Sequence, residues 1–266
     1  MGGPRDSLTR LLIVLWTLAV LVFLYVPMVS VVLASFTRKR YFSFPITAWD
    51  TRWYERALES LSVRDLIATS LSVAVVVTVF SVVLGFCSAL AFARYDWKGR
   101  KLFQKMILLP IFFPQAVLGL ALLLWFSNIG IITSWKTAAF AHMIWIVPIV
   151  TLIMSIQVYS FDPALEEAAF DMGASRWQVL REITLPLLSP GIVSGAIFAF
   201  LLSWGNFPLS LFSTGADQTV PEWLYAKMVS GYTPMVPTLG SLTMGGAALM
   251  VVLVLLGFQV RRMRRP

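Results

Sequence analysis

Hydrophobic positions along the chain form six long runs that are separated by polar connections. Each run holds between 21 and 27 residues and contains no Asp, Glu, Lys or Arg. The runs occupy residues 11–36, 67–93, 106–126, 137–160, 191–212 and 237–260. A helix rises about 1.5 Å per residue and needs about 20 apolar residues to cross a bilayer. The pattern therefore predicts an all-α polytopic membrane protein with six transmembrane helices.

Two of the connections are predicted to contain a short helix of their own. The stretch WYERALESL at residues 53–61 can form a surface helix that lies on the bilayer. In the connection 213–236, Pro221 suits the first position of a helix, and Gly231 suits its end.

Prolines interrupt several of the predicted spans. Each proline removes a backbone donor and can kink a helix. A broken helix is tolerated at membrane depth where it faces protein or a watery cavity. Two interpretations therefore stay open, a simple bend or a break that shapes a pathway. They apply to Pro27, Pro110, Pro114, Pro148 and Pro208.

The composition excludes a water-soluble class. Hydrophobic residues make up 58% of the 266 residues, charged residues make up 13%, and the mean hydropathy is +0.81. Soluble domains carry about 25% charged residues. The longest polar connection, 37–66, is too short for a soluble catalytic or nucleotide-binding domain. We therefore expect a single membrane domain over residues 1–266.

Basic residues favour an orientation with both termini in the cytoplasm. In this orientation the inner segments hold thirteen of the 21 Lys and Arg residues, and the outer connections hold eight. The positive-inside rule describes this bias, although the run Arg38–Arg40 opposes it. Topology and contact with lipid headgroups explain the net charge of +8, so no nucleic-acid partner is expected.

The predicted spans offer little chemistry at membrane depth. His142 lies alone in the run 137–160, so a packed, hydrogen-bonded imidazole is a better interpretation than a metal site. Cys87 is the single cysteine, so the chain has no internal disulfide. Proton-driven carriers place several ionisable groups in the membrane, whereas a sodium site can use backbone carbonyls.

Because the spans hold so few ionisable groups, the energy for any transport must come from outside this chain. Otherwise the protein is a self-sufficient channel or an ion-coupled carrier. Metalloprotease, nucleophile-elbow and P-loop motifs are not found in the sequence. A membrane enzyme would need clustered acidic groups or histidines at the interface, and the acidic stretch 162–171 is the single candidate.

The inner connection 161–190 is predicted to fold as helix, glycine turn and helix. Asp162 suits the N-cap of the first helix, and Gly173 suits its left-handed end. Ser175 and Gln178 form a capping box for the second helix, which Pro186 is expected to stop. Each helix has about 10 residues, which is too short to span a bilayer.

This helix pair needs a partner for its apolar side. The second helix carries an apolar stripe, and the first carries carboxylates at Asp162, Glu166, Glu167 and Asp171. Helices that float on lipid prefer Lys and Arg, because anionic headgroups repel carboxylates. A groove in a partner protein therefore fits better than a lipid surface. The stripe consists of Trp177, Leu180, Ile183 and Leu187.

The same connection carries a known signature. Glu167, Ala168, Ala169, Gly173, Ile183, Leu185 and Pro186 follow the pattern EAA-x3-G-x9-I-x-LP with every spacing kept. This pattern resembles the signature loop of the permease subunits of type I ABC importers. The resemblance extends from about the second run to the end of the chain. The resemblance implies the fold of type I ABC importer permeases. It also implies a core at about 67–260 and a coupling loop at 161–190.

The resemblance also implies partners. The chain would be a multi-pass permease of the bacterial inner membrane and no enzyme, and it would bind no cofactor. It would pair with a homologous second permease, two cytoplasmic ATPase subunits that bind ATP and Mg, and an extracytoplasmic solute-binding protein. The resemblance implies a docking end at Glu167, Ala168, Ala169 and Gly173 and a membrane anchor at Ile183, Leu185 and Pro186. Glu166, Asp171 and Ala174 are predicted as further coupling residues.

Within the family, the sequence is most similar to the spermidine/putrescine permeases of the second type. The stretches that carry this similarity are LEEAAFDMGASRWQVLREITLPLLSPGI, STGADQTVPEWLYAKM and GYTPMVPTLGSL. That group tends to carry acidic residues in the fifth span, where this chain has Gly205 and Asn206. The resemblance implies a polyamine-like or related small organic solute, and other relatives carry opines, phosphonates, sulfate or iron.

A substrate pathway is expected near the fifth span. Asn206 places a polar amide beside Pro208 in an otherwise apolar run. This amide either lines the pathway or bonds to the backbone that the proline frees. The candidate pathway residues are Trp204, Asn206, Phe207, Trp125 and Tyr232.

Overall fold

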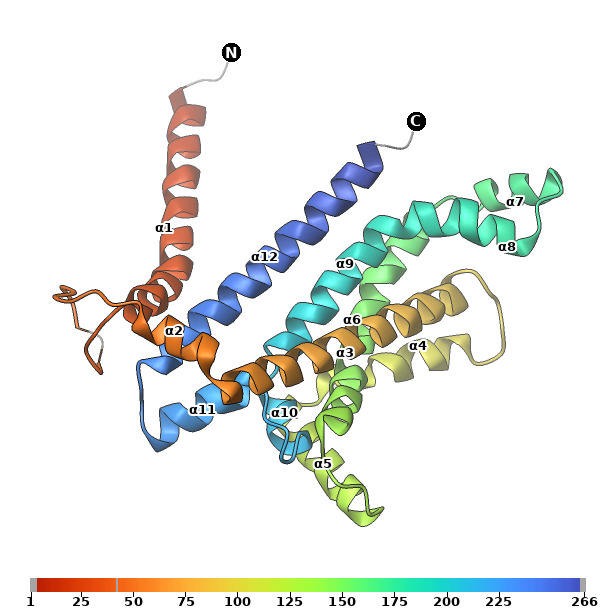
Figure 1. Cartoon of the computed structure of the whole chain (residues 1–266). Coiled ribbons are helices and arrows are strands. Elements are labelled where there is room, and N and C mark those ends of the chain that lie inside the picture. The colour runs from red at the N-terminus through yellow and green to blue at the C-terminus, as the bar shows by residue number, and fades with distance from the viewer. Residues whose placement is uncertain (1–3, 42, 264–266) are drawn as a thin grey trace. The chain divides into compact units, whose positions relative to one another are not determined.

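The computed structural model describes residues 4–41 and 43–263, and these are almost entirely helical (Figure 1). The chain divides into two compact units, one of residues 1–63 with 224–248 and one of residues 64–223 with 249–266. Helices in the first half are α1 (Pro4–Ser35), α2 (Arg52–Glu59), α3 (Leu61–Ala93), α4 (Arg100–Leu108), the 3-10 turn η1 (Leu109–Phe112) and α5 (Gln115–Asn128). They are followed by α6 (Trp135–Ser160), α7 (Ala164–Asp171), α8 (Arg176–Val179), the π-helical η2 (Leu180–Thr184), α9 (Leu185–Trp204), α10 (Pro208–Ser213), α11 (Val220–Ser230) and α12 (Met235–Met263).

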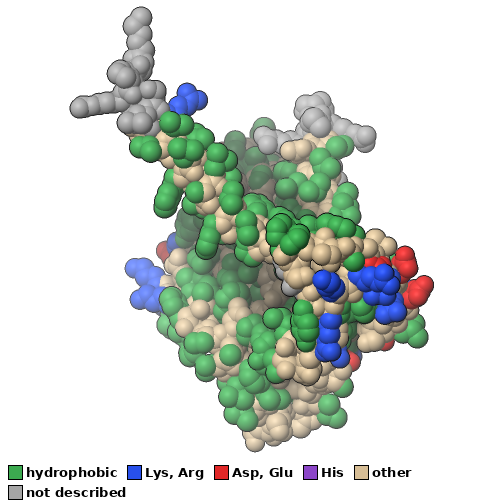
Figure 2. All heavy atoms as spheres, turned by 90° about the vertical axis from the view of Figure 1, so that its left-hand side faces the viewer, with side chains coloured by type: hydrophobic (Ala, Val, Ile, Leu, Met, Phe, Trp, Pro, Cys, Tyr) green, Lys and Arg blue, Asp and Glu red, His purple; other side chains and the backbone are tan. Residues whose placement is uncertain are grey.

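Among the described residues, five helices are long and apolar enough to cross a membrane. They begin with Thr9–Ser35 and Leu61–Ala93 and continue with Trp135–Ser160, Arg176–Trp204 and Met235–Val260. A sixth span requires counting Arg100–Phe112 and Gln115–Asn128 together, although they are bent by 101°. Hydrophobic side chains spread over the face in Figure 2, whereas charged side chains gather in a few places. The all-α polytopic prediction is confirmed.

The third predicted span is broken rather than gently bent, which decides between the two interpretations left open for Pro110 and Pro114. Pro110 sits in the 3-10 turn, and Phe113 adopts an extended backbone directly before Pro114. The ring of a proline disfavours the helical conformation in the residue before it, so the helix breaks there. The sequence contained this signal, but apolar length alone does not show it.

The fifth predicted span has different limits from those expected. Its helix continues from the inner connection and ends at Trp204, and α10 begins separately with Pro208. Proline suits the first turn of a helix, where its missing N–H costs nothing. The apolar run 191–212 therefore contains one helix end, a break at residues 205–207 and one helix start.

The core of the larger unit lies around α6 and α9. Ile146, Val150 and Met154 of α6 are fully buried and belong to the main apolar cluster. A Cβ added at Gly191 of α9 would lie 2.9 Å from the Cβ of Gln157, so this glycine permits close approach of the two backbones. Small residues allow tight helix packing in membranes, where the hydrophobic effect does not drive association.

The smaller unit joins α1 and the following connection to the start of α12. The hydroxyl of Tyr54 lies 2.5 Å from that of Ser35, and its ring stacks on Phe36. Short helices are confirmed at both predicted places, as α2 and as α11, which ends before Gly231. Their positions relative to the bilayer stay predictions. Most of α1 exposes large hydrophobic side chains, as expected for a lipid- or protein-facing span.

Candidate functional site

The inner connection begins with a capped helix, as predicted. The carboxylate of Asp162 accepts a hydrogen bond from the backbone N–H of Ala164 at 3.0 Å, and α7 follows. Glu166 and Glu167 lie in its first turn, where carboxylates interact favourably with the positive end of the helix dipole.

A glycine turn ends α7. Gly173 has a φ of +84°, a conformation that L side chains rarely adopt. The N–H of Gly173 donates to the carbonyl of Phe170 at 2.9 Å, and the N–H of Ala174 donates to that of Ala169 at 3.0 Å. These two bonds form a Schellman motif and satisfy carbonyls that the helix end leaves free. The prediction of a left-handed Gly173 is confirmed.

The second helix starts as expected but does not end as expected. The backbone N–H of Gln178 donates to the hydroxyl of Ser175, and the side chain of Gln178 accepts from the N–H of Ser175, which completes the capping box. The helical path then runs through Pro186 into α9. The expectation that Pro186 stops the helix is therefore wrong. The π-helical turn Leu180–Thr184 comes directly before it, and such a wider turn accommodates the proline ring and its missing donor.

Large apolar side chains of the pair point into solvent. Met172 is 83% exposed and Trp177 is 65% exposed, and Leu165 and Phe170 are also exposed. Ala169 and Val179 are instead buried and pack the two helices within the chain. Exposed apolar groups gathered on one short segment are typical of an interaction site. We call Leu165, Phe170, Met172 and Trp177 the apolar tip.

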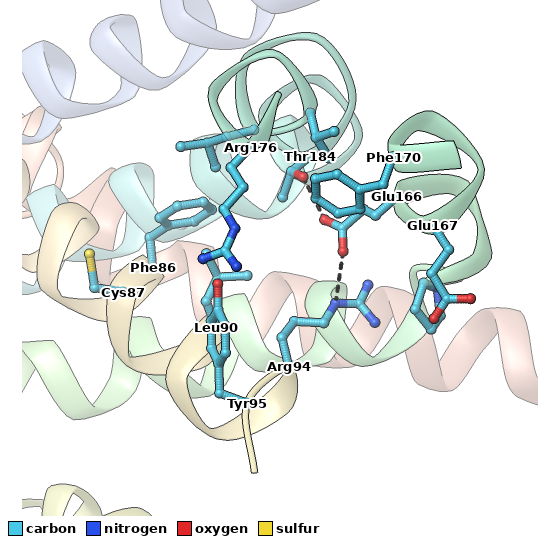
Figure 3. Close-up of a pocket in the computed structure, with 13 residues that line it drawn as sticks. Phe86, Cys87, Leu90, Arg94, Tyr95, Glu166, Glu167, Phe170, Arg176 and Thr184 are labelled. Atoms are coloured by element: carbon cyan, nitrogen blue, oxygen red, sulfur yellow. Dashed lines mark hydrogen bonds and ion pairs between the residues drawn. The ribbon is translucent and has the colours of Figure 1, made fainter. Parts of the chain in front are cut away.

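The two adjacent glutamates of α7 face different surroundings (Figure 3). One carboxylate oxygen of Glu166 accepts a hydrogen bond from the hydroxyl of Thr184 at 2.5 Å, and the other lies 3.7 Å from the Nε of Arg94. Glu167 is exposed and lines the same cavity, and Figure 3 draws interactions for Glu166 but not for Glu167. The sequence predicted both as coupling residues, and the structure pairs Glu166 within the chain.

Arg94 follows the end of α3 and connects it with two other elements. Its Nη2 donates to the carbonyl of Phe161 at 2.9 Å, and its guanidinium lies 4.8 Å from the centre of the Phe161 ring. Sequence reasoning did not single out Arg94 as a site residue. Its position directly after a long apolar run was the available signal, but it did not identify a partner.

A cavity of about 600 Å³ lies between α3 and the helix pair. Phe86, Cys87 and Leu90 of α3 form one wall, and Phe170 and Val179 belong to the other. Arg176 extends into this space in Figure 3. The helix pair is therefore not packed densely against α3.

The remaining predicted coupling residues lie around this pair. Ala168 and Asp171 are exposed and Ala174 is half-buried, which places them at or near the tip. Ile183 packs against the main apolar cluster. Leu185 and Pro186 are half-buried at the start of α9. Their roles in docking and anchoring stay predictions.

The break in the fifth span is held by buried polar groups. Asn206 is 4% exposed, and its amide oxygen accepts from the N–H of Leu209 at 3.0 Å. Its amide nitrogen lies 3.5 Å from the side-chain oxygen of Gln115 on α5. The amide thus bonds to the backbone of α10, which is one of the two interpretations left open above. A role of Asn206 in the pathway stays a prediction.

His142 joins both sides of the same break. Its Nδ1 lies 2.9 Å from the hydroxyl of Ser203, before the break, and its Nε2 lies 3.0 Å from that of Ser210, after it. The hydroxyl of Ser210 donates a hydrogen bond to the carbonyl of Asn206, so it must accept one from the Nε2–H of His142. In this tautomer, Nδ1 carries no hydrogen and accepts a hydrogen bond from the hydroxyl of Ser203. The interpretation of His142 as a packed, hydrogen-bonded imidazole is confirmed.

The aromatic pathway candidates belong to both units. Trp204 is half-buried and stacks on Phe200, and Phe207 is half-buried in the break. Trp125 is half exposed and packs beside Phe126 and Phe140. Whether these residues contact solute stays a prediction.

Tyr232 belongs to the smaller unit. Its ring stacks on Tyr41, and its backbone carbonyl accepts from Arg40 at 3.2 Å. Partial burial raises the pKa of its hydroxyl above the usual value, because the charged form loses solvation. The structure therefore presents Tyr232 as a neutral aromatic side chain.

Residues 4–41 and 43–263 contain no cluster of three or more His, Cys, Asp or Glu side chains that could hold a metal ion. The buried polar groups described above form hydrogen bonds and an ion pair that connect helices of the larger unit.

Comparison with known proteins agrees with this arrangement. The family described as "Binding-protein-dependent transport system inner membrane component" matches residues 81–265. The spermidine/putrescine transport system permease protein PotC of Escherichia coli is 29% identical over 235 residues, covering 88% of this chain and 89% of that protein. The putrescine transport system permease protein PotI of Escherichia coli is 29% identical over 250 residues, covering 88% and 87%.

Solved structures show the same fold. A chain of a bacterial alginate ABC transporter, in complex with an alginate pentasaccharide-bound periplasmic protein, superposes with a TM-score of 0.70 at 19% identity, covering 98% of this chain and 96% of that one. A chain of the MetNI methionine ABC transporter gives a TM-score of 0.57 at 17% identity, covering 77% and 98%.

The family match spans well over half of the chain, and it includes the whole helix pair. Proteins of this family lie in the inner membrane and act in a complex with a binding protein and an ATPase. They are transport components rather than enzymes. The chain therefore belongs to the inner-membrane components of binding-protein-dependent transport systems and is a permease subunit of an ABC importer.

Proposed function

We propose that residues 161–190 form the coupling element through which an ATPase subunit drives this permease. The observation that carries the proposal is the apolar tip, which is exposed on a helix pair with both caps satisfied. Satisfied caps hold the exposed side chains in a fixed arrangement. A rigid apolar segment of this size fits a groove in a partner protein, as in helix-in-groove recognition.

The chain forms half of a translocation pathway in this proposal. A homologous second permease would provide the other half, and two ATPase subunits would bind one helix pair each. ATP and Mg would be held by the ATPase subunits, and this chain would bind no cofactor. The half-exposed Trp125 and the extensively exposed α1 support further protein partners in the membrane.

Transport would proceed by alternating access. Closure of the ATPase dimer on ATP would displace the docked helix pairs, and the cavity would open outward to receive solute from the binding protein. A ligand or partner shifts such an equilibrium only through different contact energies in the two states. The apolar tip must therefore contact the ATPase differently in the inward and outward states.

The docking proposal can be tested with two exposed apolar residues. Met172 lies in the tip, and Ile132, which is 89% exposed, lies in the connection between α5 and α6. We expect Met172→Asn to reduce the ATPase that copurifies with a tag on this chain, and Ile132→Asn to leave it unchanged. Equal yields from both variants would refute docking through the tip.

The same two positions test the orientation. With the helix pair in the cytoplasm, six spans place both termini on that side. We expect Met172→Cys in whole spheroplasts, in a Cys87→Ser background, to resist an impermeant maleimide, and Ile132→Cys in the same background to react. The reverse result would place the pair outside and end the proposal.

For the solute we propose a polyamine-like or related small organic compound. The similarity to the Escherichia coli permeases for spermidine and putrescine supports this choice. Aromatic faces such as that of Trp125 can attract an ammonium group, which compensates in part for the missing carboxylates in the fifth span. Mass spectrometry of the copurified binding protein should find a polyamine, and a bound carboxylate or phosphonate would overturn this choice.

A self-sufficient channel or ion-coupled carrier remains to be tested directly. The purified chain alone in liposomes should not take up labelled spermidine, whereas liposomes with the complete complex and internal ATP should do so. Uptake by the chain alone would favour the channel or carrier.

A further inference from the structure

An ion pair connects the end of α3 with α7. Arg94 lies directly after the end of α3, and its Nε lies 3.7 Å from a carboxylate oxygen of Glu166. Its Nη2 also donates to the carbonyl of Phe161, at the end of α6, at 2.9 Å. One side chain therefore contacts the ends of two membrane helices and the first turn of the helix pair.

Glu166 extends this connection to a third helix. Its second carboxylate oxygen accepts from the hydroxyl of Thr184, which is buried in the π-helical turn before α9. Figure 3 shows the carboxylate of Glu166 between Arg94 and Thr184. We call these three side chains the Glu166 bridge.

Partial burial strengthens this bridge. The side chains of Arg94 and Glu166 are 15% and 18% exposed. Attraction between opposite charges increases as water is excluded, because the effective dielectric constant falls. The uncharged hydroxyl of Thr184 donates a hydrogen bond to the carboxylate of Glu166. This bond satisfies a lone pair that the ion pair with Arg94 leaves free.

Apolar packing offers α7 little alternative support. Among the residues of α7, Ala169 is the one that is buried, and its side chain is a single methyl group. The cavity of about 600 Å³ lies between the pair and Phe86 and Leu90 of α3. A void removes the dispersion contacts that a packed interface would supply.

We propose that Arg94 and Glu166 are positioning residues that make the helix pair move together with α3 and α6. The proposal rests on the proposed function, since it gives the route by which a docked ATPase would displace the spans. It also separates two neighbouring carboxylates. Glu166 is bound to Arg94 and Thr184, whereas Glu167 is exposed.

The test measures the position of α7 against α3 in the importer complex purified through a tag on this chain. Spin labels would be placed at Ala164→Cys on α7 and Val83→Cys on α3, two exposed positions outside the bridge, in a Cys87→Ser background. We expect one narrow distance distribution that is the same without nucleotide and after trapping with ATP and vanadate. In Arg94→Gln or Glu166→Gln we expect it to broaden or shift by about 5 Å, one helical turn.

A matched control separates positioning from other effects. Glu167→Gln removes the same charge from the neighbouring residue and should keep the native distance distribution. A native distribution in Arg94→Gln and Glu166→Gln, or a broadened one in Glu167→Gln, would overturn the proposal.

The ATPase yield in the same preparations distinguishes this proposal from the docking proposal. If the bridge only positions the pair, Arg94→Gln should retain the native amount of copurified ATPase. A loss of ATPase equal to that of Met172→Asn, with an unchanged distance, would make Glu166 a docking residue and refute the bridge. If the docking proposal were wrong, the yield of copurified ATPase would not change in Met172→Asn. The distance between the two spin labels would still test the Glu166 bridge.

Discussion

The helix pair and the break in the fifth span are both interruptions of membrane helices, but they treat their side chains in opposite ways. At the break, Asn206, His142 and both neighbouring serines are buried, and each has a hydrogen-bond partner inside the chain. At the helix pair, backbone groups are capped internally, whereas Met172 and Trp177 have large apolar surfaces in solvent.

The difference reflects the two surroundings. An unpaired polar group inside the membrane costs several kcal/mol, so a break there must be satisfied within the protein. In water, exposed apolar surface is the costly feature, and a protein retains it where a partner covers it. A polar break in a span is therefore weak evidence for a solute site, whereas an apolar tip outside the membrane is good evidence for a docking site.

The largest effect is expected at the turn of the helix pair. Gly173→Pro imposes a φ of about −65° where the structure has +84°, and it removes the N–H that bonds to Phe170. We expect copurification of the ATPase and solute uptake to be abolished, with the detergent-purified membrane domain still helical by circular dichroism. Gly173→Asn, which tolerates a left-handed backbone, should retain most activity. Normal uptake in Gly173→Pro would contradict a rigid coupling element.

The next effect is expected at the break. His142→Phe keeps most of the side-chain volume but leaves Ser203 without its partner, and Ser210 without its donor. Each buried unsatisfied group costs about 1–3 kcal/mol, so a total loss of about 2–6 kcal/mol in unfolding free energy is expected. Denaturation in detergent would measure this loss. The amount of copurified ATPase should fall only in proportion to the amount of folded chain. A larger loss of ATPase would contradict the distinction between the break in the fifth span and the helix pair.

The reverse pattern is expected for the exposed tryptophan of the tip. Trp177→Ala should change stability by less than about 0.5 kcal/mol, because the side chain is mostly in solvent. It should weaken ATPase binding by about 2 kcal/mol, or roughly 30-fold, as truncation of an interface hot spot does. Titration of the ATPase onto detergent-purified chain would measure the affinity, and denaturation in detergent would measure the stability. Unchanged affinity would remove Trp177 from the docking surface.

The smallest effect is expected at the cap of α10. Asn206→Ala removes the acceptor for the N–H of Leu209 and should cost about 1 kcal/mol of stability. Asn206→Asp keeps an acceptor at this position and should cost less. Thermal unfolding in detergent compares the two variants. If Asn206→Ala lowers uptake of labelled spermidine much more than it lowers stability, Asn206 contacts solute as well as the helix start.

Much of the helix pair could be predicted because its signals are local. Asp162, Gly173, Ser175 and Gln178 each act on backbone groups within five residues, and their caps and turns are present as expected. The end of the second helix could not be predicted in this way. Whether Pro186 stops a helix depends on the width of the preceding turn, and the π-helical turn is not visible as a hydrophobic pattern.

Membrane spans were predicted from length and hydropathy, which are also properties of a sequence alone. Five spans agree with this rule, and the third is a bent pair of helices, because Pro114 extends the backbone of Phe113. Apolar length reports that a segment prefers lipid. It does not report whether its helix is straight.

The membrane class, the helix-turn-helix connection and the family signature follow from the residues of the chain alone, because these features depend on apolar length, caps and fixed spacings. The packed helices were needed to show that Glu166 rather than Glu167 pairs with Arg94, and that His142 bridges serines 61 and 68 positions away along the chain. The physical reason is that a hydrogen bond or an ion pair extends over only a few ångströms. Its partners are therefore known only when helices that are distant in sequence have been packed together.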